Sequence, residues 1–234
     1  MITATNPTGG ITAWTVQHID GSSYLNSIAC AGVGLCEAAD GEDRLLRSTT
    51  PWTACEPVTF PGFDALTALA CPSRSSCVAV DGFGDHVASS SRPGGAWRVA
   101  RVTRGIGEDP EIWRVACATG SMCLALVTDM GPPGASGAGG TLYTFDPIGA
   151  AHGFSRLRIR GAETSIGFEE VACVRARGCA ALDFAGHVFS SSTPGRAPSW
   201  RRDRSGRRWF AVSCPTARLC VAVDGDGGVV VGRR

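Results

Sequence analysis

Short apolar segments recur along the chain, and each is bounded by residues that favour turns. In every recurrence one apolar run precedes a cysteine, and a second run follows another cysteine six positions later. A third run follows a turn rich in Gly and Asp. In most recurrences an aromatic residue then opens a fourth run; these residues are Trp52, Trp97, Phe154 and Trp200. Runs of this length between turn residues predict four short β-strands in each recurrence.

The recurrence is carried by ten of the eleven cysteines, which form five pairs with the spacing C-x5-C. The first members of successive pairs are 41, 46, 56 and 41 residues apart. A period of about 40 residues is the length of one four-stranded blade of a β-propeller. We therefore predict an all-β fold with one domain over residues 1–234, a five-bladed β-propeller with four antiparallel strands per blade.

The cysteine spacing predicts one disulfide in each blade. Two cysteines six positions apart face each other across the hairpin of the first and second strands, within bonding distance. The alternative is a metal site, but zinc sites favour shorter spacings with His or Cys partners, and no His lies inside these loops. Cys55 is left without a partner, and we expect it to be a buried or unreactive thiol. The expected pairs are Cys30–Cys36, Cys71–Cys77, Cys117–Cys123, Cys173–Cys179 and Cys214–Cys220.

The two ends of the chain suggest how the ring closes. Only 20 residues follow Cys214, enough for three strands of the last blade. The segment AWTVQHID near the N-terminus resembles the fourth strands, with Trp14 in place of their aromatic residue. We predict that this segment, near residues 12–20, completes the last blade, which would leave no open sheet edge.

Composition and charge narrow the classes of partner. The 22 basic residues are all Arg, as in proteins from high-GC bacterial genomes, and the net charge is only +1. This balance argues against nucleic-acid binding. No stretch is long and apolar enough for a membrane span, and the first ten residues do not resemble a signal peptide.

Because five disulfides need an oxidising compartment, we predict an extracellular or cell-surface protein. We expect a monomer without a metal ion or cofactor.

The repeats resemble a known family. The segments SCPTARLCVAVDGDGGVVV, CPSRSSCVAVDGFGDHVASSSRPGGAW and CVRARGCAALDFAGHVFSSSTPGRAPSW resemble bacterial β-propeller repeats of the BNR/Asp-box, sialidase-like type. The Asp-box is degraded, because residues 90–97 read SSRPGGAW, with Arg92 where the family has Asp. The resemblance implies a fold and does not imply sialidase activity. The chain has only Tyr24 and Tyr143 as tyrosines and no recognisable Arg triad.

One face of such a propeller carries the loops between blades and the turns between second and third strands. Ligands of this fold usually bind there, around the mouth of the central channel. An Asp recurs in these turns, and its recurrence predicts a structural role in capping the turn. His86 and His187 recur at equivalent positions too, so we predict a structural role for them as well. The recurring residues are Asp40, Asp81, Asp183 and Asp224.

Differences between blades are better indicators of function than similarities. At the start of the first strands, blades three and four alone carry charge, namely Arg114, Glu169 and Glu170. Because Glu169 and Glu170 are adjacent, their side chains would point to opposite faces of a regular strand. Blade three also has a Gly-rich insertion near residues 131–140 on the same face, typical of a binding loop or of a segment without order.

We predict a non-catalytic recognition module that binds a carbohydrate, another polar ligand or a protein at this face. Aromatic side chains would stack on apolar faces of the ligand, while charged groups bind its polar groups. The expected binding residues are Trp113, Arg114, Glu169, Glu170, Trp209 and Phe210. The alternative is a glycoside hydrolase or lyase that uses paired carboxylates at the channel mouth. Its candidate catalytic residues are Glu169, Glu170, Glu163 and Glu111.

Overall fold

A computed structural model gives the arrangement of most of the chain. It describes residues 2–4, 11–16, 18–19, 21, 23–31, 35–48, 56–60, 62–83, 86–91, 96–101, 110–129, 140–149, 153–160, 162, 167–174, 178–203, 208–216 and 219–233. Cys55, Glu163 and the insertion near 131–140, apart from Gly140, lie outside these residues.

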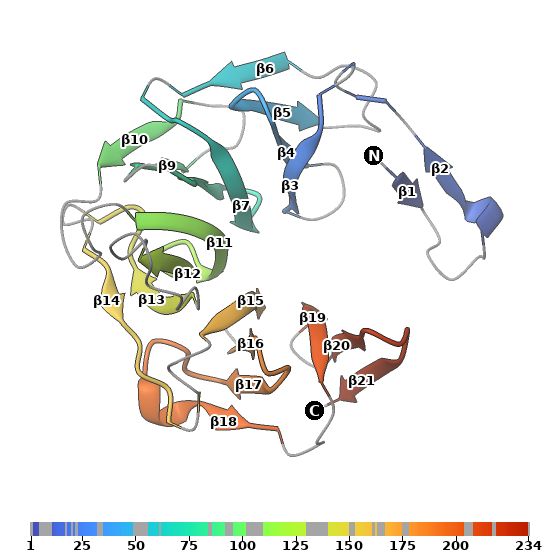
Figure 1. Cartoon of the computed structure of the whole chain (residues 1–234). Helices are drawn as coiled ribbons and strands as arrows, with labels where there is room; N and C mark the ends of the chain where they lie inside the picture. Colours follow the sequence, from blue (N-terminus) through green and yellow to red (C-terminus); the bar gives the residue numbers. More distant parts are fainter. Residues whose placement is uncertain are drawn as a thin grey trace.

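Five antiparallel sheets follow one another along the chain and are arranged around a common centre (Figure 1). The two 3-10 helices, η1 (Ile11–Ala13) and η2 (Ala197–Ser199), are three residues long. In the part of the chain that the structure describes, no helix could cross a membrane. The all-β, five-bladed prediction is therefore confirmed.

Each of the first four blades has four strands. Blade 1 contains β3 (Leu25–Cys30), β4 (Cys36–Asp40), β5 (Arg44–Ser48) and β6 (Glu56–Thr59). Blade 2 contains β7 (Leu66–Ser73), β8 (Ser76–Asp81), β9 (His86–Ser90) and β10 (Arg98–Arg101). Blade 3 contains β11 (Pro110–Thr119), β12 (Met122–Asp129), β13 (Thr141–Phe145) and β14 (Ser155–Arg156). Blade 4 contains β15 (Phe168–Val174), β16 (Gly178–Asp183), β17 (Val188–Ser191) and β18 (Arg201–Arg202).

Blade 5 has three strands, and the N-terminal segment does not complete it. Its sheet contains β19 (Trp209–Thr216), β20 (Leu219–Asp224) and β21 (Val229–Arg233). The segment predicted to close the ring forms β2 (Trp14–Val16), which pairs with β1 (Ile2–Ala4) in a separate two-stranded sheet.

The closing strand was thus predicted wrongly, and loop closure offers a physical reason. A hairpin between neighbouring segments closes a short loop, whereas pairing with β21 joins the two ends of the chain at a larger entropic cost. Figure 1 shows β2 apart from β21. The last strand keeps exposed apolar side chains at Val229, Val230 and Val231.

The hydrophobic core is divided among the interfaces between successive blades. One cluster of buried side chains joins blades 1 and 2, another joins blades 2 and 3, and two more join the later pairs. In blades 1 to 4 the second strands are the most buried; all six residues of β8 are buried. Because a single sheet cannot bury both of its faces, each blade depends on its neighbours for a core.

All five predicted disulfides are present, each between cysteines with a sequence separation of 6. In blades 1, 3 and 4 the two cysteines are direct cross-strand partners, as the hairpin argument requires. In blades 2 and 5 they lie where the register of the hairpin shifts. Several disulfides are typical of proteins from oxidising environments.

The Cys117–Cys123 bridge lies in a buried part of blade 3 and offers a test of what these bonds contribute. Replacing both residues with Ala should lower the free energy of unfolding by about 2 kcal/mol, because the seven-residue loop is no longer closed in the unfolded chain. Urea denaturation followed by circular dichroism measures the change. An unchanged free energy would show that this bridge does not stabilise the blade.

Candidate functional site

The first strand of every blade carries the same irregularity near its beginning. The register with the second strand skips one residue in β3, β7, β11, β15 and β19. A β-bulge of this kind leaves one residue unpaired and changes the direction of its side chain. These five residues, here called the bulge ring, are Asn26, Thr67, Trp113, Glu169 and Phe210. The first strands lie innermost in Figure 1, so the bulge ring belongs to the strands nearest the common centre of the five sheets.

In blades 1 and 2 the bulge residue joins its blade to the next one. The Asn26 side-chain amide donates hydrogen bonds to the backbone oxygens of Asp40 (3.2 Å) and Leu66 (3.1 Å). The Thr67 hydroxyl donates to the backbone oxygen of Ile112 (2.8 Å). Leu66 and Ile112 directly precede the bulges of the following blades. These two side chains therefore have a structural role.

In blade 3 the bulge residue is an exposed aromatic side chain in a fixed position. Trp113 is 51% exposed, and its Nε1 donates to the hydroxyl of Thr128 (2.7 Å). That hydroxyl donates in turn to Glu111 Oε2 (3.3 Å). Because the indole is anchored at its polar edge, its apolar surface is presented to solvent at little entropic cost on binding.

Phe210 occupies the equivalent position in blade 5 and is 47% exposed. Its ring lies over Gly225, where a Cβ atom would come within 2.8 Å of the ring, so only glycine allows this packing. The Arg208 guanidinium lies over the ring, 5.6 Å from its centre, in a cation–π arrangement.

Charged side chains of blades 3 and 4 meet between these aromatic residues. Arg114 Nε lies 3.4 Å from Glu170 Oε2, and its Nη1 donates to the backbone oxygen of Trp113 (2.9 Å). Such exposed pairs contribute only about 0–1 kcal/mol to stability, so both groups are available to a ligand at little cost. Within the described residues, the Glu169 side chain forms no hydrogen bond or ion pair.

Among the predicted site residues, the structure brings Arg114 into contact with Glu170 and places Trp113, Glu169 and Phe210 at equivalent bulges of successive blades. The bulge at Glu169 breaks the regular alternation on which the expected opposite orientation of Glu169 and Glu170 rested. Trp209 differs from the other predicted binding residues, because it is only 2% exposed and packs in the core between blades 4 and 5. It directly precedes the bulge, and the neighbouring Phe210 is the exposed aromatic residue.

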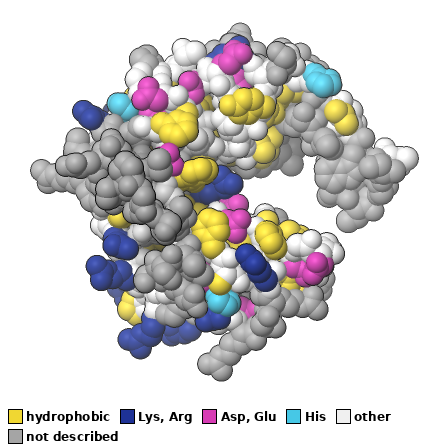
Figure 2. Space-filling model, in the orientation of Figure 1, with side chains coloured by type: hydrophobic (Ala, Val, Ile, Leu, Met, Phe, Trp, Pro, Cys, Tyr) yellow, Lys and Arg dark blue, Asp and Glu magenta, His cyan; other side chains and the backbone are white. Residues whose placement is uncertain are grey.

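Three further aromatic residues on the same face are exposed, although the sequence pattern did not single them out as binding residues. Tyr24 precedes β3, and Phe83 and Phe184 lie in the turns after β8 and β16. All three are exposed, so each blade contributes one exposed aromatic residue to this face. Their place beside a recurring Asp or a first strand was a signal that could have identified them. Figure 2 shows hydrophobic side chains interspersed with acidic and basic ones around the centre of the ring.

The recurring Asp residues cap turns, as predicted. The Asp40 carboxylate accepts hydrogen bonds from the backbone N–H groups of Glu42 (2.9 Å) and Arg44 (2.8 Å). Asp183 likewise accepts from the backbone N–H of His187 (2.8 Å) and contacts its Nδ1 (2.9 Å). Asp81 and Asp224 also accept backbone N–H groups. Burial raises the pKa of Asp81, although these hydrogen bonds oppose the shift.

A shallow cavity of about 410 Å³ lies elsewhere, at the outer strands of blade 2. It is lined by Ser89, Ser91, Ala96, Trp97, Arg98 and Ile148. None of the predicted binding or catalytic residues lies in this lining.

A buried carboxyl group at the joint between blades 1 and 2 was also missed. Glu37 is fully buried and accepts two hydrogen bonds from Arg47, an adjacent cross-strand partner. Burial raises the pKa of Glu37 from its ordinary value of 4.5, while Arg47 acts in the opposite direction. With Cys71 and Cys77 it forms a group of metal-ligand type, but the two sulfurs are bonded to each other.

Comparison with known proteins shows the fold. No family model and no curated protein matches the sequence. Among solved structures, YCF48 bound to D1 peptide is similar with a TM-score of 0.63 and 12% identity, over 96% of this chain and 70% of that one. U3-55K is similar with a TM-score of 0.67 and 13% identity, over 94% and 70%. Human WBSCR16 has a TM-score of 0.60 and 16% identity, over 91% and 63%.

The RRP9 WD40 repeats are also similar, with a TM-score of 0.62 and 14% identity. These neighbours have β-propeller-like folds, and the chain shares that fold. The resemblance to the BNR/Asp-box type stays a prediction.

The capping role of Asp183 can be measured by substitution. Asp183→Ala should lower the free energy of unfolding by about 1–3 kcal/mol, because the partly buried backbone N–H and the Nδ1 of His187 both lose their partner. Asp226→Ala changes an exposed carboxylate in the equivalent turn of blade 5 and should alter stability by less than about 0.5 kcal/mol. Equal effects in the two variants would contradict the capping role.

The raised pKa of Glu37 predicts a pH dependence of stability. A carboxyl group with a raised pKa in the folded state stabilises the fold below its unfolded pKa, and this contribution is lost as the pH rises through the folded pKa. Wild type should therefore gain stability relative to Glu37→Gln as the pH falls from 8 to 4.5, by at most about 1.4 kcal/mol per pH unit. Urea denaturation of both proteins across this range measures the difference. A difference that stays constant or shrinks on acidification would contradict the prediction.

Proposed function

We propose that this chain is a non-catalytic recognition module whose ligand lies across the bulge ring of blades 3, 4 and 5. The proposal rests on one observation: the five bulge residues do not all have the same role. Two bulge side chains hold blades together, whereas Trp113 and Phe210 are exposed at equivalent positions and Glu169 is half-buried without a partner among the described residues. Anchored aromatic residues beside charged groups are the usual centres of binding energy in recognition surfaces.

The chemistry of the site favours a peptide with a basic or amide-bearing side chain. Glu169 lacks a partner among the described residues, and Glu111 and Glu170 add negative charge that Arg114 only partly offsets. An extended peptide could place apolar side chains on Trp113 and Phe210 and a donor group near Glu169. The similarity to YCF48, whose structure contains a D1 peptide, supports this class of ligand.

A carbohydrate is the second candidate, because an exposed indole flanked by carboxylates also suits a sugar ring. Its C–H face would stack on Trp113 and its hydroxyls would bind Arg114 or Glu169. In either case the five disulfides support an extracellular or cell-surface location.

Catalysis receives less support from the geometry. Glu111 accepts a hydrogen bond from Thr128, and Glu170 is paired with Arg114. Both carboxylates therefore already have partners within the protein. A glycosidase also needs a carboxyl group of raised pKa as its general acid. Burial raises the pKa of Glu37 and Asp81, which lie at an interblade joint and in a turn, away from the candidate catalytic residues.

Peptide and glycan arrays probed with the folded protein test the proposal. A ligand found on either array should bind at least tenfold more weakly to Trp113→Ala and to Phe210→Ala, because each variant removes an exposed aromatic contact. Ile148→Ala, an exposed apolar residue of another surface, serves as the matched control and should bind normally. Hydrolysis of an array ligand by wild type, abolished in Glu169→Gln, would overturn the proposal in favour of the hydrolase. Equal binding by wild type and both aromatic variants would place the site elsewhere.

A further inference from the structure

Glu37 departs from the pattern of its repeat position. It directly follows the second cysteine of its blade, where the other blades have Val78, Leu124, Ala180 and Val221. The side chain is fully buried, in a place that the fold otherwise fills with apolar groups. Burying a carboxyl group is costly unless both of its oxygens have partners. The surroundings of each oxygen therefore matter.

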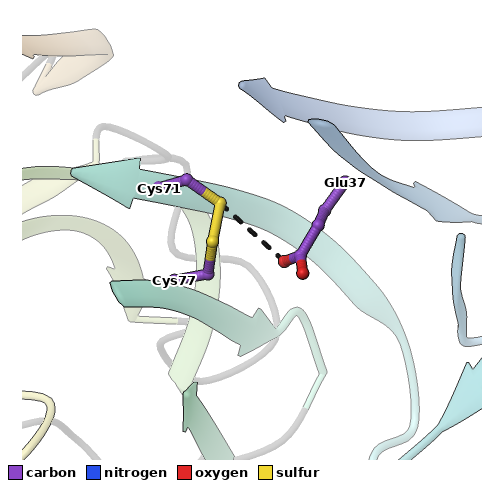
Figure 3. Close-up of side chains that lie close together, drawn as sticks. All are labelled: Glu37, Cys71 and Cys77. Carbon is purple, nitrogen blue, oxygen red and sulfur yellow. Dashed lines mark hydrogen bonds between the residues drawn. A yellow bond between two sulfur atoms is a disulfide. The ribbon is translucent and has the colours of Figure 1, made fainter. Parts of the chain in front are cut away.

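The two oxygens of Glu37 meet different groups. Oε1 accepts both hydrogen bonds from Arg47, from Nε at 3.0 Å and from Nη2 at 2.8 Å. Oε2 faces blade 2 and lies 3.8 Å from Cys71 Sγ (Figure 3). The oxygen, Cys71 Sγ and Cys77 Sγ lie within 4.8 Å of one another.

The contact with Cys71 depends on the oxidation state of the sulfur. A disulfide sulfur carries no proton, so it cannot donate a hydrogen bond to an ionised Oε2. A thiol can donate one, and hydrogen bonds to a buried carboxylate are among the stronger ones. Within the described residues, no other group donates to Oε2. Opening the disulfide thus supplies the donor that this oxygen lacks.

We propose that Cys71–Cys77 is a site of thiol–disulfide exchange, in which Glu37 of the neighbouring blade binds the thiol proton of Cys71. Cys71 is partly exposed, whereas Cys77 is fully buried, so an incoming thiol reaches Cys71. The site is separate from the proposed ligand site, because Cys71 lies in blade 2, four positions beyond the bulge residue Thr67 along β7, whereas the ligand site lies in blades 3, 4 and 5.

The exchange proceeds in two steps with a low-molecular-weight thiol as reductant. Its thiolate attacks Cys71 Sγ, a bond forms between these two sulfurs, and the bond to Cys77 breaks. The electron pair remains on Cys77, which takes a proton from solvent. A second reductant thiolate then attacks the reductant's sulfur in the mixed disulfide and releases Cys71. Cys71 takes a proton and donates it in a hydrogen bond to Glu37, while the reductant leaves as its own disulfide.

The other blades provide internal controls. Cys173 occupies the position of Cys71 in blade 4 and is also partly exposed. Its sulfur lies 3.7 Å from the backbone oxygen of Ala116, a neutral acceptor, instead of a carboxylate. Cys173–Cys179 therefore shares the position and access of Cys71–Cys77 but lacks the charged partner.

The test equilibrates the full-length chain in a series of glutathione redox buffers. Acid quenching, differential alkylation and peptide mass spectrometry then report the reduced fraction of each pair separately. In wild type, Cys71–Cys77 should have a reduction equilibrium constant about tenfold larger than that of Cys173–Cys179, equivalent to about 30 mV for this two-electron couple. In Glu37→Gln this advantage should disappear, while the other four pairs change by less than about twofold.

Equal reduction of the two pairs in wild type overturns the proposal without any variant. A shift of all five pairs in Glu37→Gln would also overturn it, because the effect would then come from general loosening of the fold. The same three groups could alternatively hold a metal ion after reduction. Protection of reduced Cys71 and Cys77 from alkylation by Zn²⁺ alone, in the absence of any wild-type advantage over Cys173–Cys179, would replace exchange with a metal site.

Discussion

The packing of each sheet against the next is the contact on which the rest of the structure depends. A single blade is a narrow sheet with apolar side chains on both faces, and only its neighbours cover them. Clusters of buried residues lie at the four successive interfaces from blade 1 to blade 5. The disulfides act at a different level, because each bridge holds one hairpin inside a blade. Blade integrity and ring assembly therefore rest on separate interactions.

The bulges link this architecture to the proposed ligand site. In a regular strand, side chains alternate between the two interblade faces, and none is directed toward the channel mouth. One extra residue in each first strand breaks the alternation and releases one side chain per blade. Where that residue is Asn or Thr, it binds the backbone of the next blade. Where it is Trp or Phe, the same bulge leaves an exposed aromatic side chain, and these residues belong to the proposed ligand site.

The repeats in the sequence were enough to predict the blades and the disulfides. They were not enough to predict the bulges or the place of the N-terminal strand, because both depend on how two strands pair. Cysteine spacing identified the hairpins because a hairpin fixes which residues are opposite each other, as for Cys30 and Cys36. The bulges could not be read in this way, since a register shift is a property of two strands together. Consequently Trp209 and Phe210 looked equivalent in the sequence, although one is buried and the other exposed. Closure by residues 12–20 failed because resemblance to a fourth strand does not determine which edge that strand will join.

The joint between blades 1 and 2 combines apolar packing with several polar contacts. Leu66 donates its backbone N–H to Asp43 (2.9 Å) and accepts from Asn26, while Leu69 donates its N–H to Ser27 (3.1 Å). Glu37 adds a buried charge to this joint, which an apolar side chain would fill at lower cost in free energy. Directional contacts fix the relative position of two blades more strictly than apolar packing does, because each hydrogen bond is lost when the blades slide. A change in the state of Cys71 would act on a joint whose geometry is set by hydrogen bonds, so its effect would reach the relative placement of two blades.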